Sequence, residues 1–314
     1  MRINNVCVLG GTGFVGSALS CALHDTGRRV RVLTRRRERH RELLVLPRVE
    51  LRQADVHDPE TLKQALQGMD AVINLVGILN SRGKGRRSFR EVHVELVKKV
   101  MRACLDQGVP RLLHMSALNA DASRGSSRYL RSKGEAENHV HTFAGKRVAV
   151  TSFKPSVIFG PGDGLFNRFD RLLRLSPVLP LACPQARFAP VYLGDVVRCF
   201  VDALEDEATF DQHLELCGPE VFTLREIVAY TAALTGRHNL IVGLPNWLSR
   251  LQATVLELFP GPPFSRDNYD SLQTDSVCHG GASQPTRVSA VVPRYLRRAS
   301  RDAQFQTWRQ RANR

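Results

Sequence analysis

Three polar residues in the middle of the chain have the types and the spacing of a hydride-transfer site. Tyr129 and Lys133 are four residues apart, so both side chains lie on one face of a helix. An ammonium one turn away favours the phenolate and lowers the pKa of the phenol, which makes tyrosine a usable proton donor or base. Ser116 lies thirteen residues before Tyr129, where a strand ends, and is placed to hydrogen-bond a substrate oxygen. We predict catalytic roles for Ser116, Tyr129 and Lys133, with a nicotinamide giving or taking the hydride.

A glycine-rich turn near the N-terminus would bind the nucleotide that carries this nicotinamide. It follows an apolar strand at 3–9 and precedes a helix at 14–25. The early glycine permits a tight turn, the central one lets the backbone approach a pyrophosphate, and the last lets helix and strand pack closely. The free N–H groups of the helix then point at phosphate. The predicted contacts in this turn are Gly10, Thr12, Gly13, Phe14, Val15 and Gly16.

The end of the second strand, predicted over 29–34, determines which nucleotide is preferred. NAD-selective folds usually place an acidic residue there, whereas an arginine can pair with the 2′-phosphate of NADP. Arg35 and Arg36 occupy this place. We therefore predict NADP(H), with NAD(H) less favoured. The alternative is that this arginine-rich loop is simply solvated.

Further strand ends complete the predicted cofactor site. Strands are expected over 49–54, 71–77 and 111–116, each followed by a helical pattern. This order predicts an α/β fold of the Rossmann type, a doubly wound parallel sheet with the cofactor over its carboxyl edge. The residues assigned to the cofactor at these ends are Asp55 and Val56 beside the adenine, Val76, Gly77 and Pro155, with Lys133 also holding the ribose.

The domain organisation follows from where the apolar periodicity changes. We predict an NAD(P)-binding Rossmann domain over 1–154, a smaller substrate-side region over 155–293 interleaved with the sheet, and a basic tail over 294–314. Within the second region we expect a strand at 188–192 and a helix at 195–204 with Asp195 as its N-cap. A Thr-x-x-Glu capping pattern starts another helix at Thr223.

Composition excludes several classes of protein. No apolar run approaches the ~20 residues that span a bilayer, and no secretory signal is visible at the N-terminus, so we expect a cytoplasmic protein. The seven cysteines are odd in number and never spaced as Cys-x-x-Cys, which predicts buried reduced thiols. The histidines have no ligand spacing, and we predict no metal site.

A net charge of +15 calls for an anionic partner. The tail over 294–314 holds seven arginines and one acid, and the segment 246–259 carries apolar residues at helical spacing. That stripe is usually core or a lid over a cleft, and less often a face for a membrane or a partner. We predict no nucleic-acid binding, because no recognised module is present. The remaining candidates from charge are an anionic membrane surface, or a membrane complex or other protein with an acidic surface.

These motifs together resemble the extended or atypical branch of the short-chain dehydrogenase/reductase superfamily. The resemblance covers nearly the whole chain and includes the segments 154–163, 190–196 and 215–219. Through 114–118 and 129–137 it is similar to the nucleotide-binding accessory subunit of respiratory complex I and its bacterial relatives. This resemblance implies a bound NADPH without a firmly assigned reaction.

One departure from the family pattern bears on activity. Active extended members usually carry an asparagine in the fourth helix that relays protons, and His93 occupies the matching place. Histidine can relay a proton, and it can equally be a satisfied helical residue. Two functions therefore stay open: a complex I-related protein in which the cofactor is mainly structural, or an active NADP-dependent reductase, dehydrogenase or epimerase on a carbonyl or alcohol. The small-molecule substrate is not readable from the sequence.

Overall fold

A computed structural model of the chain describes residues 1–81, 85–86, 88–259, 264–278, 280 and 283–296. It divides into two compact units. The first unit comprises residues 1–155 and 196–216, and the second comprises 156–195 together with the described residues from Cys217 onward. Among the described residues, no helix combines the length and the apolar character needed to cross a membrane. Most of the tail, residues 297–314, lies outside the described residues.

The first unit contains a seven-stranded parallel sheet in the order β11-β6-β5-β4-β1-β2-β3. Its strands are β1 (Asn5–Leu9), β2 (Arg29–Thr34), β3 (Val49–Gln53), β4 (Ala71–Asn74), β5 (Arg111–Met115), β6 (Ala149–Pro155) and β11 (Gln212–Leu216). The order reverses between β1 and β4, as in a doubly wound fold, where ligands bind at the carboxyl ends of the strands. The predicted fold class is confirmed.

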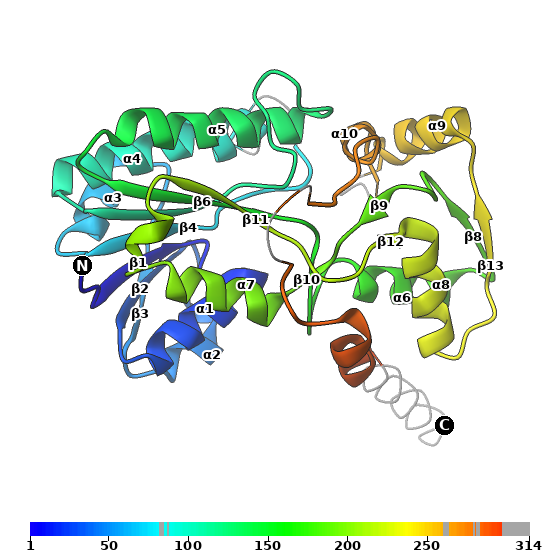
Figure 1. Cartoon of the computed structure of the whole chain (residues 1–314), viewed down its shortest axis with the longest axis horizontal. Helices are drawn as coiled ribbons and strands as arrows, with labels where there is room; N and C mark the ends of the chain where they lie inside the picture. The colour runs from blue at the N-terminus through cyan, green and yellow to red at the C-terminus, as the bar shows by residue number, and fades with distance from the viewer. Residues whose placement is uncertain (82–84, 87, 260–263, 279, 281–282, 297–314) are drawn as a thin grey trace. The chain divides into compact units, whose positions relative to one another are not determined.

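Helices cover both faces of this sheet (Figure 1). They are α1 (Phe14–Asp25), α2 (Arg41–Leu44), α3 (Pro59–Leu66), α4 (Leu96–Gln107), α5 (Arg128–Ala144) and α7 (Leu193–Asp202), with short η1 (Arg37–Arg39) and η3 (Glu207–Thr209) and a π-helical turn η2 (Arg90–Glu95). Helices α3, α4 and α5 lie on one face, and their apolar side chains form the main core with the sheet. Burial of this core provides the main driving force for folding.

Local signals explain where the helices begin. Asp58 caps α3 by accepting from the Thr61 N–H, and Ser127 caps α5 by accepting from the Leu130 N–H at 3.1 Å. In α8 (Leu224–Leu234) the capping box of Thr223 and Glu226 forms as predicted. Caps of this kind fix the first residue of a helix and therefore the direction in which its faces point.

The second unit contains short strands and helices. They are β7 (Ile158–Phe159), α6 (Phe166–Leu175), β8 (Val178–Leu181), β9 (Arg187–Phe188), β10 (Val191–Tyr192), β12 (Phe222–Thr223), α8, β13 (Leu240–Gly243), α9 (Asn246–Leu256) and α10 (Arg266–Ser271). The single strand predicted over 188–192 is wrong, because Ala189 and Pro190 separate β9 from β10 and proline donates no ladder hydrogen bond.

The N-cap role predicted for Asp195 is also wrong. Helix α7 already begins at Leu193, and Asp195 lies in its first turn. The Asp195 side chain is buried and accepts from the Thr286 N–H at 3.1 Å. Its carboxylate therefore anchors a distant segment of the second unit.

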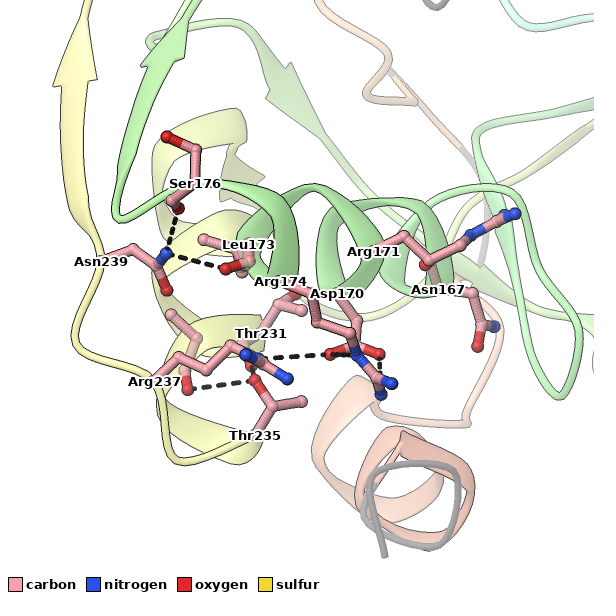
Figure 2. Close-up of polar contacts among 11 residues, drawn as sticks. Asn167, Asp170, Arg171, Leu173, Arg174, Ser176, Thr231, Thr235, Arg237 and Asn239 are labelled. Atoms are coloured by element: carbon pink, nitrogen blue, oxygen red, sulfur yellow. Dashed lines mark hydrogen bonds and ion pairs between the residues drawn. The ribbon is translucent and has the colours of Figure 1, made fainter. Parts of the chain in front are cut away.

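A buried carboxylate joins α6 to the segment after α8 (Figure 2). Asp170 is 4% exposed and contacts the Arg174 guanidinium at 2.7 Å and the Arg237 Nε at 3.7 Å. Asn239 donates to the carbonyls of Leu173 and Ser176, at 2.9 and 2.6 Å, and so satisfies the end of α6. Two cations and one amide thus hold the end of α6 in place.

One further prediction for the second unit is wrong. Cys217 and Cys278 form a disulfide, whereas all seven cysteines were expected to be reduced; the fold brings them together across 61 residues of sequence, which no local spacing reveals.

Of the alternatives left open for the apolar stripe of α9, burial in the core does not hold. Trp247, Leu251 and Val255 are exposed, while the small Ser249 and Ala253 face inward. Two other members of the stripe, Leu248 and Leu256, are half-buried.

Candidate functional site

The turn between β1 and α1 has the geometry of a phosphate-binding loop. Gly10 has φ of 76°, a region that glycine adopts without strain, and a Cβ on it would approach the Val76 nitrogen to 3.1 Å. A Cβ on Gly16 would lie 2.2 Å from the Gly10 carbonyl oxygen. Gly13 precedes α1 and provides no side-chain cap, so the first N–H groups of α1 are left for a ligand. The turn therefore fits the pyrophosphate of a dinucleotide.

The other residues predicted in this turn surround it. Thr12, Phe14 and Val15 are half-buried, so part of each side chain faces outward. Arg35 and Arg36 directly follow β2, the neighbour of β1, and both are exposed. Among the described residues, neither guanidinium has an acidic partner. The carboxyl edge of the sheet thus presents cationic side chains beside the glycine turn.

Asp55 and Val56, two predicted cofactor residues, follow β3. Asp55 accepts from the His57 N–H at 3.0 Å and from the Arg86 guanidinium at 2.8 Å. These contacts hold the pKa of Asp55 below its usual value, with the hydrogen bond from the His57 backbone as the largest cause. Val56 packs against the main core. Only part of the basic loop over 81–90 is described, and Arg82, Lys84 and Arg87 lie outside the described residues.

Lys133 lies beneath the end of β4. Its side chain is buried and its Nζ donates to the Met115 carbonyl at 2.9 Å. A Cβ on Gly77 would lie 3.2 Å from this Nζ, so the backbone after β4 passes close to the ammonium. Burial lowers the pKa of Lys133 to about 8, although Glu137 opposes the shift. The fold therefore brings the glycine turn, Val76, Gly77 and Lys133 together.

Tyr129 lies half-buried one turn before Lys133 on α5. Its ring packs edge-on against Phe89 and His93, with centroids 6.0 and 5.5 Å away. The ring also packs against the cluster that contains Ala117 and Leu130. The predicted helical spacing of Tyr129 and Lys133 is present in the structure, and their catalytic role stays a prediction.

The hydroxyl of Ser116 is engaged within the fold. The hydroxyl donates to Glu137 at 2.5 Å, and both residues are buried. Glu137 also contacts the His213 Nδ1 and lies 3.5 Å from the Lys154 Nζ. A buried carboxylate requires such partners, because leaving its charge unpaired would destabilise the fold by on the order of 3 kcal/mol or more. The neighbour that packs near Tyr129 is Ala117, which has no hydroxyl.

His93 is fully engaged within the fold. Its Nε2 accepts from the Ile78 N–H at 3.0 Å, and its Nδ1 lies 2.8 Å from the Ser132 hydroxyl. Because Ser132 itself donates to the Tyr129 carbonyl, we assign the proton to Nδ1 of His93. Burial, with Lys133 and His114 nearby, lowers the pKa of His93 to about 2. His93 is therefore a neutral, satisfied helical histidine.

Sequence reasoning missed a row of polar residues under α5. Asn74, His114, Ser152 and His213 stand opposite one another on β4, β5, β6 and β11. Helix α5 places Glu137 over this row, together with His141, whose Nε2 lies 3.0 Å from the Ser152 hydroxyl.

The spacing of Lys133, Glu137 and His141 at every fourth residue was the available signal for this row. Its partners on the strands could not be inferred, because register between distant strands is not written in a local pattern.

Pro155 is the last of the predicted cofactor residues. Pro155 ends β6, and its carbonyl accepts from the Leu118 N–H at 3.0 Å. It therefore fixes the segment that follows Ser116. In the described part of the chain, no group of three or more His, Cys, Asp or Glu side chains could hold a metal ion.

The sequence pattern of the NAD dependent epimerase/dehydratase family matches residues 6–217, more than half of the chain. The chain belongs to this family. The glycine turn, the carboxyl edge and Lys133 described above all lie within the matched residues, so the first unit contains the nucleotide-binding part of an NAD(P)-dependent fold.

Two relatives are similar to this chain in sequence, and one solved structure is similar in fold. The chain is 28% identical over 226 residues to NADH dehydrogenase (ubiquinone) 1 alpha subcomplex subunit 9, mitochondrial, of Mus musculus, covering 71% of this chain and 58% of that protein. It is 28% identical over 244 residues to the ceramide reductase of Caulobacter vibrioides, covering 77% and 74%. It is thus a distant homologue of the complex I subunit and of bacterial proteins.

One solved structure with a similar fold is a UDP-glucuronic acid 4-epimerase from Bacillus cereus in complex with UDP-glucuronic acid and NAD. It superposes with a TM-score of 0.70 at 18% identity, covering 94% of this chain and 99% of that one. At this identity the likeness establishes the fold. The matched part of the chain spans less than two thirds of the mouse protein, so the activity of that whole protein does not transfer with the match.

Proposed function

We propose that this protein is an NADP(H)-binding accessory protein related to the complex I subunit, in which the nucleotide is held mainly as a structural cofactor. The observation that carries the proposal is the direction of the Ser116 hydroxyl. It donates to Glu137, while the residue that packs near Tyr129 is Ala117. A substrate oxygen at Tyr129 would thus lack the second donor that a hydride-transfer site normally supplies.

The homology supports the same proposal. The matches to the mitochondrial complex I subunit include relatives from mouse and from Arabidopsis thaliana, the latter covering 88% of this chain. His93 adds to this support, because both of its nitrogens are engaged and it cannot relay protons as the family asparagine does. We propose association with a respiratory complex on this basis.

The test is whether nucleotide stays bound without turning over. Purified protein is denatured, and the released small molecules are identified and quantified by mass spectrometry. We expect close to one NADP(H) per chain and no hydride transfer to a broad panel of carbonyl compounds. Protein that retains no nucleotide, or that oxidises NADPH with any of these compounds, would contradict the proposal.

Preference for NADP(H) over NAD(H) rests on Arg35, with Arg36 beside it. Both are exposed after β2, and among the described residues neither has an acidic partner that would compete with a 2′-phosphate. A charged hydrogen bond contributes about 1.5 to 3 kcal/mol, so NADPH should bind roughly ten- to a hundred-fold more tightly than NADH. Arg35→Glu should remove this preference, while Arg39→Glu, in η1, serves as the matched control. Equal affinities of the unaltered protein for NADPH and NADH would contradict this preference.

An active NADP-dependent reductase, dehydrogenase or epimerase is the second candidate. Two observations favour it: the Tyr129 and Lys133 pair is intact, and burial lowers the pKa of Lys133 to about 8. The relative named ceramide reductase suggests a lipid-like carbonyl or alcohol as the substrate class. If such a substrate is found, Tyr129→Phe should abolish turnover and spare NADPH binding, because the phenol acts on substrate. Undiminished turnover would remove Tyr129 from the mechanism.

We further propose that the protein attaches peripherally to an anionic membrane surface, at its cytoplasmic face. The face of α9 exposes Trp247, Leu251 and Val255, and the only charge on α9 is Arg250. The sequence of the tail adds seven arginines against one acid. Each basic residue near an anionic bilayer contributes about 1 kcal/mol, and an inserted Trp adds an apolar anchor.

Sedimentation with vesicles tests this attachment. We expect binding to anionic vesicles at low salt and little binding to neutral ones. A double variant, Trp247→Ser with Leu251→Ser, and a protein ending at Pro293 should each sediment less. Equal sedimentation of both variants and the unaltered protein would remove α9 and the tail from the attachment.

A further inference from the structure

The disulfide between Cys217 and Cys278 stands apart from the other cysteines of the chain. The remaining five are free. Burial raises the pKa of the thiols of Cys7, Cys21, Cys104 and Cys183, which keeps them protonated and unreactive. One covalent pair beside five free thiols is unusual in a reducing compartment, where disulfides are mostly transient or redox-sensing.

The disulfide holds a segment that we call the strap, residues 272–278 with 283–288. At one end of the strap, the backbone of Ser276 donates to the Arg187 carbonyl and accepts from the Ala189 N–H, at 2.8 and 2.9 Å. Its carbonyl also accepts from the Ser156 hydroxyl at 2.7 Å. These contacts fix the strap before the disulfide.

The other end of the strap is held differently. The Gln284 N–H donates to the carbonyl of Cys217 itself, at 2.8 Å. Thr286 and Val288 donate to the carboxylates of Asp195 and Glu220, at 3.1 and 3.2 Å. The strap is thus tied down at both ends, with the disulfide between them.

The strap also forms one wall of a cavity in the second unit. This cavity has a volume of about 470 Å³, and Gln273 and Asp275 of the strap line it together with Ala186 and Leu244. Asp275 is held there by Arg187, whose backbone N–H donates to Oδ1 at 3.0 Å and whose Nε donates to Oδ2 at 2.9 Å. Movement of the strap would therefore change the shape of this cavity.

We propose that the Cys217–Cys278 disulfide is a redox-sensitive clasp, opened by a dithiol reductant, that fixes the strap over this cavity. Cys278 is half-buried, whereas Cys217 is 4% exposed, so Cys278 is the sulfur that a reductant reaches. A thiolate of the reductant attacks the Cys278 Sγ, the S–S bond breaks, and Cys217 leaves as a thiolate that takes up a proton. The second thiol then displaces Cys278, so that two electrons pass from the dithiol and two cysteine thiols result.

The clasp is tested on the full-length protein by counting thiols. Alkylation and mass spectrometry of protein purified without reductant should give five reactive cysteines after denaturation and a linked pair of peptides. Treatment with dithiothreitol under native conditions should raise the count to seven. Seven free thiols at the outset, or a bond that opens only after denaturation, would overturn the proposal.

Hydrogen exchange tests the effect on the strap. Amides of the strap should exchange at least about tenfold faster after reduction, because the remaining hydrogen bonds open locally. Cys278→Ala leaves the buried Cys217 in place and should exchange fast with or without reductant. Cys21→Ser, in α1 of the first unit, is the matched control and should respond like the unaltered protein. Reduction that leaves exchange unchanged would also overturn the clasp. Nucleotide content, measured in parallel, reports separately on the proposed function.

Discussion

The two units each bury a carboxylate inside a set of polar partners, and the partners differ. Asp170 in the second unit lies between two guanidinium groups, those of Arg174 and Arg237. Glu137 in the first unit is held by a serine hydroxyl, a lysine and His213. The first arrangement is a clamp of opposite charges. The second combines one lysine with hydrogen-bond partners, so less of its stability depends on ion pairing.

The largest expected effect is on the clamp. Asp170→Ala leaves two arginines without their buried acceptor and should lower the free energy of unfolding by about 3 kcal/mol. The control is Glu257→Ala, which breaks an exposed pair with Arg266 and should cost no more than about 1 kcal/mol. Urea unfolding followed by circular dichroism gives both values. Similar losses for the two variants would show that burial of Asp170 adds nothing.

A smaller loss is expected at Glu137. Glu137→Gln keeps the shape and an acceptor for Ser116 but removes the charge that faces His213 and Lys154, so about 2 kcal/mol should be lost. Glu135→Gln, on the exposed side of the same helix, is the matched control. If Glu137→Gln instead matched the loss of Asp170→Ala, the two carboxylates would not differ in kind.

The smallest effect concerns pH and the first unit alone. Burial, with His213 nearby, lowers the pKa of His141 to about 4. Below about pH 6.5 His141 is protonated in the unfolded chain, but it stays neutral in the folded chain until about pH 4. The free energy of unfolding therefore falls as pH drops from about 6.5 to about 4.

Because His141 is partly exposed, its share of this loss is on the order of 1 kcal/mol. His141→Asn should reduce the loss between these two pH values, as measured by urea midpoints at each. His93 and His114 add to the same loss, since burial lowers their pKa values too. An unchanged pH dependence in His141→Asn would contradict the assignment.

Local patterns in the sequence were enough for the sheet and the glycine turn. Gly10 to Gly16, the strand ends and the one-turn spacing of Tyr129 and Lys133 all depend on neighbours within a few residues, and their elements formed as expected. The direction of Ser116 could not be predicted in the same way. A strand-end residue can face either side, and Glu137 becomes its partner only once α5 is docked on the sheet.

The same reason explains the other misses. His213 meets Glu137 across 76 residues of sequence, and Cys217 meets Cys278 across 61. The exposed stripe of α9 has the period of a core helix, and only packing decides which face is covered. Periodicity therefore identified the helix but could not decide which of its faces is covered.

The packing of α9 affects how the surface of this protein can evolve. Helix α9 turns Ser249 and Ala253 inward and Trp247 and Leu251 outward. These two large side chains therefore contribute little to the stability of the second unit. Substitutions among the outer residues are close to neutral for folding, as surface changes usually are. Evolution can therefore change which surface α9 recognises, one residue at a time, while the nucleotide-binding fold stays constant.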